Sequence, residues 1–150
     1  MTAFDLGRRF DAVVCLFSSI GYVKTIEGLQ RAIACMARHV APGGVLVVEP
    51  WFAPETYRVG HVAALFVDRP QLKIARMNVS EVRGRISVLT FQYLVGTPDG
   101  VEHFAERHEL GLFTRGEHEA AFGAAGLEVT HDPQGLIGRG LYVGTWPARA

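Results

Sequence analysis

A chain of 150 residues with 49% hydrophobic residues has the size of one domain and enough apolar material to bury a core. Lys and Arg together number 15, as do Asp and Glu, so the basic surface of a nucleic-acid binder or a polybasic membrane anchor is not expected. No apolar run approaches the roughly 18 to 20 residues of a membrane span, and the start of the chain lacks the apolar stretch of a signal peptide. We therefore expect a cytoplasmic protein whose partner is a small molecule or another protein.

A short buried strand is the first predicted element. Residues 10–17 form a continuous apolar block with β-branched residues, which is typical of a strand covered on both faces. Cys15 falls in this strand and Cys35 in the next predicted helix, with neither a Cys-x-x-Cys spacing nor a disulfide framework around them. We expect both cysteines to be buried, reduced thiols.

An amphipathic helix is predicted next, because apolar residues recur at spacings of three and four. These residues are Ile26, Leu29, Ile33, Met36 and Val40. Thr25 stands where it can cap the first turn, and Glu27 lies where the helix dipole favours a negative charge. The helix is expected to end at residues 41–44, Ala-Pro-Gly-Gly, since proline cannot continue the hydrogen-bond ladder and glycine accepts the left-handed cap conformation.

A second apolar block, at residues 45–48, predicts another buried strand. Strand, helix and strand joined by short connections predict a parallel, right-handed crossover and therefore an α/β sheet covered by helices. Ligands of such sheets bind at the carboxyl ends of the strands, which here are residues 17–22 and 49–52.

The middle of the chain has a different pattern, in which polar and apolar residues alternate or nearly alternate. This holds at residues 72–82 and 85–95, and turn signals fall at residues 83–84 and 98–100. The pattern predicts an antiparallel meander or hairpin pair, half exposed, within residues 55–103. We expect this segment to serve as a lid or substrate platform.

The rest of the chain is predicted to return to the α/β core. A strand at residues 108–113 leads to a helix, whose first residues 114–117, Thr-Arg-Gly-Glu, fit a capping box. Gly126 is expected to close this helix. A strand pair at residues 127–130 and 140–145 then completes the sheet.

Four segments of the sequence together resemble one family. They are FDAVVCLFSSIGY at 10–22, ARHVAPGGVLVVEPW at 37–51, GLFTRGEHEAAFGAAGL at 111–127 and GRGLYVG at 138–144. The chain is similar in these segments to the class I S-adenosylmethionine-dependent methyltransferases that dimethylate the amine of nucleotide-linked deoxyamino sugars in macrolide pathways. The resemblance runs along essentially all 150 residues. It is weaker in the meander and departs from the family at residues 132–137, where the family is glycine-rich.

The resemblance implies one truncated methyltransferase domain, with an α/β core at residues 1–54 and 104–150 and an antiparallel substrate platform at 55–103. The fold would be the C-terminal part of a Rossmann-like sheet with an antiparallel β meander inserted. The family's opening strand, glycine turn and acidic residue, which hold S-adenosyl-L-methionine, do not precede Met1. A misplaced start codon, a frameshift or a genuine fragment would each give this sequence. We expect the truncated chain alone to be inactive, and the alternative is a non-catalytic remnant that keeps an acceptor-binding or dimerisation surface.

The resemblance also implies residues for the cofactor and the reaction. Tyr22 corresponds to the position that faces the attacking nitrogen and is the candidate catalytic residue, although its ring could equally pack beside the helix. Met1 and Thr2 would border the adenine of the cofactor. Leu16 and Phe17 would pass alongside its methionine and adenosine parts, whereas by pattern alone an apolar strand end belongs to the core.

Three further residues are candidates for binding the acceptor. Trp51 offers an aromatic face for a sugar or base, or it fills the boundary between the core and the meander. Arg76 and Arg139 could clamp the diphosphate of a nucleotide-linked sugar, because a planar guanidinium binds phosphate oxygens in pairs. A homodimer is a further possibility that the resemblance raises.

Other chemistries have little support in the sequence. The six histidines include no His-x-x-x-His spacing and no grouping with cysteine, so we expect no metal site. Ser18 and Ser19 lack the Gly-x-Ser-x-Gly pattern of a hydrolase nucleophile. The first strand is followed by no phosphate-binding glycine loop, so another class of nucleotide-binding Rossmann domain is not favoured.

Overall fold

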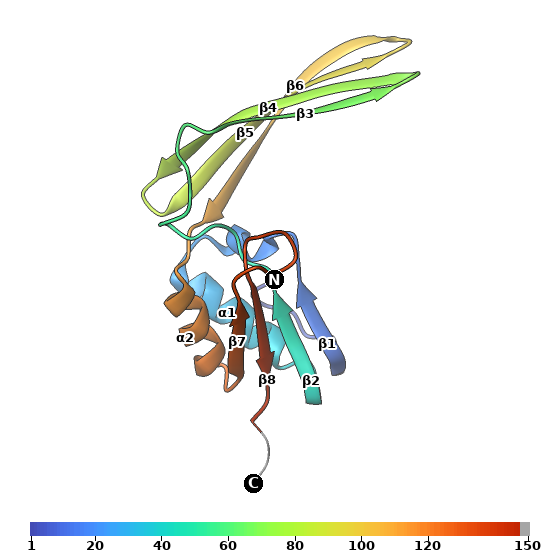
Figure 1. Cartoon of the computed structure of the whole chain (residues 1–150). Coiled ribbons are helices and arrows are strands. Elements are labelled where there is room, and N and C mark those ends of the chain that lie inside the picture. The colour runs from blue at the N-terminus through green and yellow to red at the C-terminus, as the bar shows by residue number, and fades with distance from the viewer. Residues whose placement is uncertain (148–150) are drawn as a thin grey trace. The chain divides into compact units, whose positions relative to one another are not determined.

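The first structural unit is built on a four-stranded sheet with the order β1-β2-β8-β7 (Figure 1). In the computed structural model, which describes residues 1–147, these strands are β1 (Phe10–Cys15), β2 (Val40–Val48), β7 (Glu128–Asp132) and β8 (Leu141–Thr145). β1 and β2 are parallel, whereas β8 is antiparallel to both β2 and β7. The predicted parallel crossover and the predicted closing strand pair are therefore confirmed.

Two helices lie on one face of this sheet, α1 (Ile26–Ala37) and α2 (Arg115–Ala124) (Figure 1). Both begin where the sequence predicts. The Thr25 side chain accepts a hydrogen bond from a backbone N–H of the first turn of α1, and Thr114 forms a complete capping box at the start of α2. The helices and the covered face of the sheet share one apolar core. Its large members include Ile20, Leu29, Ile33, Leu46, Val48, Phe113, Phe122 and Tyr142.

The end of α1 differs from the prediction. We expected the helix to reach Val40, but it ends at Ala37, and Val40 already pairs with Phe10 of β1. The next pair in the ladder is Ala12 with Val45, so β2 contains a bulge at the Ala-Pro-Gly-Gly segment. A proline, which lacks an N–H, and a glycine with φ of +79° at position 43 suit this irregular stretch. The predicted stop signal therefore lies inside β2, after the residue at which the helix ends.

The second unit, Tyr57–Leu110, is a separate antiparallel sheet with the order β3-β4-β5-β6. Its strands are β3 (Val62–Arg69), β4 (Leu72–Arg83), β5 (Ile86–Thr97) and β6 (Gly100–Gly111). The central hairpin of β4 and β5 is the predicted one, and the antiparallel meander is confirmed. The sequence did not predict β3 or the first part of β6. β3 begins with six consecutive apolar residues and most side chains of β6 are exposed, so neither strand shows the alternation of apolar and polar residues that marks a half-buried strand.

The boundaries of the units follow the strands. The first unit comprises Met1–Thr56 and the chain from Gly111 to residue 147. The sequence placed the end of the meander at residue 103, but β6 continues to Gly111. None of the helices within residues 1–147 has the length and apolar character needed to cross a membrane.

Candidate functional site

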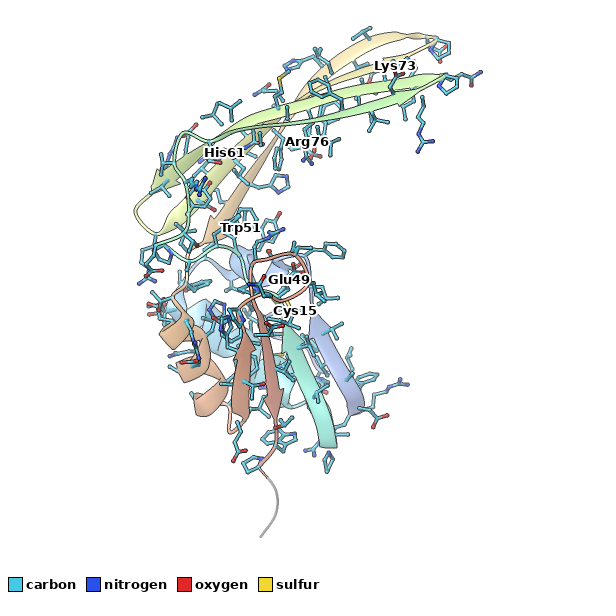
Figure 2. The ribbon with its side chains drawn as sticks, viewed as in Figure 1. Cys15, Glu49, Trp51, His61, Lys73 and Arg76 are labelled. Carbon is cyan, nitrogen blue, oxygen red and sulfur yellow. The ribbon has the colours of Figure 1, made fainter. Side chains whose placement is uncertain are left out.

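A strained turn follows the carboxyl end of β1. Phe17 and Ser18 have φ of 53° and 58°, in the left-handed region that residues other than glycine rarely adopt. The backbone N–H of Phe17 donates to Glu49 Oε2 at 2.7 Å, and Ser18 Oγ donates to the carbonyl oxygen of Pro50 at 2.7 Å. The end of β2 therefore holds this turn by two hydrogen bonds. Figure 2 shows Glu49 and Trp51 at this end of β2.

Arg139 joins the same group of residues from the loop that precedes β8. Its Nη1 donates to Ser18 Oγ at 2.8 Å, across 121 positions of sequence. Its guanidinium carbon lies 5.0 Å from the centroid of the Trp51 ring and 5.5 Å from that of Phe52, within cation–π range. Burial lowers the pKa of Arg139, and the negative charge of Glu49 opposes that shift, so the guanidinium stays charged.

A cavity of about 250 Å³ opens beside Arg139 in the first unit. It is lined by Pro50, Trp51, Phe52, Ala53, Thr56, Phe113, Arg115, His131, Pro133, Gly138, Arg139 and Tyr142. The structure thus brings together two of the residues predicted to bind the acceptor, Trp51 and Arg139. Aromatic walls with cationic groups on the rim can accept a ring that carries a phosphate.

Three cavity residues with titratable side chains, Arg115, His131 and Tyr142, were not predicted from the sequence. Arg115 is the first residue of α2, and its Nε donates to Glu119 at 2.6 Å. Burial is the main cause that lowers the pKa of His131. Burial also raises the pKa of Tyr142 to about 12, so its hydroxyl stays protonated at neutral pH. The capping box was the sequence feature that could have identified Arg115, because it places this residue at the start of a helix. Residues at helix starts and strand ends often bind ligands.

Of the predicted cofactor residues, Leu16 and Phe17 directly follow β1, and Met1 lies near the last residue of that strand. Met1 Sδ lies 4.0 Å from Cys15 Sγ, which places the Met1 side chain beside the last residue of β1. The Phe17 side chain is 85% exposed, so it is not part of the core, and Leu16 and Thr2 are half-buried. The exposed Phe17 ring offers an apolar face at the end of β1, on which a flat ring such as adenosine could stack.

The remaining predicted residues lie as follows. Tyr22 belongs to η1 (Ser19–Val23), the 3₁₀ turn after β1, and its side chain is 49% exposed. Arg76 lies on β4 in the second unit, with its guanidinium carbon 4.7 Å from the centroid of the Phe91 ring (Figure 2). Cys15 and Cys35 are free and buried, and burial raises the pKa of the Cys15 thiol to about 11, so it is no nucleophile. Within residues 1–147 no three metal-binding side chains gather into a site.

Known proteins resemble this chain closely over nearly all of its length. A dTDP-3-amino-3,4,6-trideoxy-alpha-D-glucopyranose N,N-dimethyltransferase of Streptomyces venezuelae is 48% identical over 145 residues. These are 96% of this chain and 61% of the relative. A dTDP-4-amino-2,3,4,6-tetradeoxy-D-glucose N,N-dimethyltransferase of Saccharopolyspora spinosa is 40% identical over 141 residues, which are 94% of this chain and 57% of the relative. The chain therefore spans about three fifths of the length of these relatives. No protein-family model matches the sequence.

Solved structures give the same result for the fold. DesVI of Streptomyces venezuelae superposes with a TM-score of 0.94 at 46% identity, over 97% of this chain and 62% of that one. CalS10 of Micromonospora echinaspora, an amino pentose methyltransferase solved with S-adenosylmethionine bound, has a TM-score of 0.89 at 41% identity, over 97% of this chain and 62% of that one. Sequence and structure together confirm the resemblance: this chain is a relative of the nucleotide-sugar N,N-dimethyltransferases and has the fold of S-adenosylmethionine-dependent methyltransferases.

Proposed function

We propose that this chain forms the acceptor-binding part of an S-adenosylmethionine-dependent methyltransferase that methylates the amine of a nucleotide-linked amino sugar. The similarity to sugar N,N-dimethyltransferases supports the reaction class. The observation that carries the acceptor class is Arg139, a charged guanidinium held by Ser18 and Trp51 at the rim of an aromatic cavity. In this proposal Arg139 and Arg115 bind the diphosphate and Trp51 packs against the sugar or the base. Arg76 on β4 is a further candidate for the diphosphate.

The chemistry asks mainly for alignment. S-adenosylmethionine, when bound, would supply an electrophilic methyl group to the neutral nitrogen of the acceptor, so the residues of this chain serve to align the two. In our proposal Met1, Thr2, Leu16 and Phe17 contact the cofactor. The Tyr22 hydroxyl would accept a hydrogen bond from an N–H of the attacking amine, so that the nitrogen lone pair faces the methyl group.

Two substitutions test this proposal in a polypeptide extended to the length of its relatives. Arg139→Ala should raise the Michaelis constant for a nucleotide-linked amino sugar by about ten- to a hundredfold, because a charge-assisted contact contributes about 1.5 to 3 kcal/mol to ground and transition states alike. Tyr22→Phe should lower mainly kcat. Steady-state kinetics with both substrates varied separates the two effects.

The matched control is Arg31→Ala, which removes an exposed guanidinium of α1 in the same unit. If the Arg139→Ala and Arg31→Ala variants have the same Michaelis constant, the acceptor places no phosphate at Arg139. If the extended polypeptide also fails to bind S-adenosylhomocysteine in calorimetry, the chain is a non-catalytic remnant that has kept only an acceptor or dimer surface.

We further propose that the protein is a homodimer through the second unit. One face of its sheet carries exposed apolar side chains, since cross-strand pairing places Val62 with Val79, Ala64 with Met77, and Ala75 with both Phe66 and Leu94. Of these side chains Phe66 is 70% exposed. A continuous apolar sheet face of this kind is typical of a surface that packs against another sheet.

A further inference from the structure

Glu49 is a buried acidic residue directly after β2, and it was not among the residues predicted to bind cofactor or acceptor. It is 2% exposed, and its backbone N–H extends the β1–β2 ladder by donating to the Cys15 carbonyl oxygen at 2.9 Å. Oε2 accepts the hydrogen bond from Phe17, whereas Oε1 has no hydrogen-bond partner in the described part of the chain. A buried carboxylate is costly unless it is paired or performs a task, so its position needs a reason.

The turn that Glu49 contacts supplies the reason. Phe17 and Ser18 both adopt left-handed conformations without being glycine, and such conformations persist only where the surroundings hold them. The hydrogen bond from Phe17 to Glu49 Oε2 is short, at 2.7 Å, and it acts on the first of the two strained residues. If this bond were absent, the Phe17 backbone would be free to leave its left-handed conformation.

We propose that Glu49 is a positioning residue, which holds the Phe17–Ser18 turn so that the Phe17 ring faces the cofactor and Ser18 stays in reach of Arg139. This rests on the proposed function, in which Phe17 contacts the cofactor and Arg139 the acceptor. Ser18 Oγ donates to Pro50 and accepts from Arg139, so one turn connects the two halves of the site. Glu49 acts through the reach of its oxygen to the Phe17 N–H, and it touches neither substrate.

Two substitutions of Glu49 separate the effect of side-chain length from the effect of its negative charge. Glu49→Gln keeps the length of the side chain and an oxygen that accepts from Phe17, but removes the charge. Glu49→Asp keeps the charge and withdraws the oxygen by one methylene. A positioning role therefore predicts that the glutamine variant retains the behaviour of the wild type and that the aspartate variant loses it.

The first readout is the exchange rate of the Phe17 amide hydrogen, measured by NMR on this chain without any ligand. Glu49→Asp should speed this exchange about tenfold or more, whereas Glu49→Gln should stay within about threefold of the wild type. Glu128→Gln, which changes an exposed glutamate of β7, is the matched control and should change nothing at Phe17. Equal exchange in the two Glu49 variants, or faster exchange in the glutamine variant, overturns the proposal.

The second readout is calorimetric binding of S-adenosylhomocysteine by the polypeptide extended to the length of its relatives. Glu49→Asp should weaken binding about tenfold and Glu49→Gln only slightly. If the wild type binds no S-adenosylhomocysteine while Phe17 exchange follows the predicted order, the proposed function fails and the positioning of the turn stands. If binding is normal in all variants and exchange is unchanged, Glu49 has no positioning role although the proposed function stands.

Discussion

At the scale of single residues, His118 shows how burial sets the charge of a side chain. Its Nδ1 lies 3.1 Å from the Thr114 carbonyl oxygen, its ring stacks on Tyr142 with centroids 4.6 Å apart, and Nε2 has no partner among residues 1–147. Burial lowers the pKa of His118 to about 4, partly opposed by the Thr114 carbonyl and Glu117. The imidazole is therefore neutral in the folded protein at neutral pH.

This neutral histidine predicts a loss of stability in mild acid. The unfolded imidazole takes up a proton below pH about 6.5, whereas the folded one resists protonation until pH about 4. The unfolded state therefore binds more protons in this window, and the free energy of unfolding should fall by about 1.4 kcal/mol per pH unit as the pH decreases. Urea unfolding of the wild type and of His118→Gln between pH 7 and pH 4 measures the effect. Parallel pH curves for the two proteins would show that another group causes the loss.

At the scale of elements, two glycines of the first unit have opposite roles. Gly144 of β8 lies against the Phe122 ring, and a Cβ there would come within 2.5 Å of the ring. Gly123 of α2 faces open space, with nothing within 4 Å of such a Cβ. Only a residue without a side chain fits the first position, whereas the second position is an ordinary helical site.

The matched substitutions should therefore shift stability in opposite directions. Gly144→Ala overpacks the contact between α2 and the sheet and should destabilise the protein by about 1 to 3 kcal/mol. Gly123→Ala should stabilise it by up to about 1 kcal/mol, because glycine costs about that much in a helix. Thermal unfolding of both variants checks the prediction. A stable Gly144→Ala variant would mean that the Phe122 ring moves aside at little cost.

At the scale of the whole molecule, the proposed dimer predicts the mass in solution. Light scattering of the wild type should give twice the mass of one chain, because the exposed apolar face of β3, β4 and β5 is covered in a dimer. Phe66→Lys places a charge at the most exposed aromatic position of that face and should yield monomers. Lys24→Ala, outside the second unit, is the control. A wild type that stays monomeric at all concentrations rules out this interface.

Local signals in the sequence were enough for much of the fold. The apolar block at residues 10–17, the helix capped by Thr25 and the capping box at Thr114 each involve residues that are close in the chain. Their spacing therefore predicts an element directly. The same signals failed for β3 and for the first part of β6, since an exposed strand is defined by its pairing partner and not by its own pattern.

The sequence by itself determined the parallel crossover, the antiparallel meander and the resemblance to sugar methyltransferases, because each depends on short segments read in order. Only the tertiary structure decided that Ser18 and Arg139 share a hydrogen bond, that Glu49 holds the Phe17 turn, and that Arg115 joins the cavity. The physical reason is that these contacts arise where strand ends and loops pack together. Ser18 and Arg139 are 121 positions apart, and no periodic pattern in a single sequence indicates a contact over that separation.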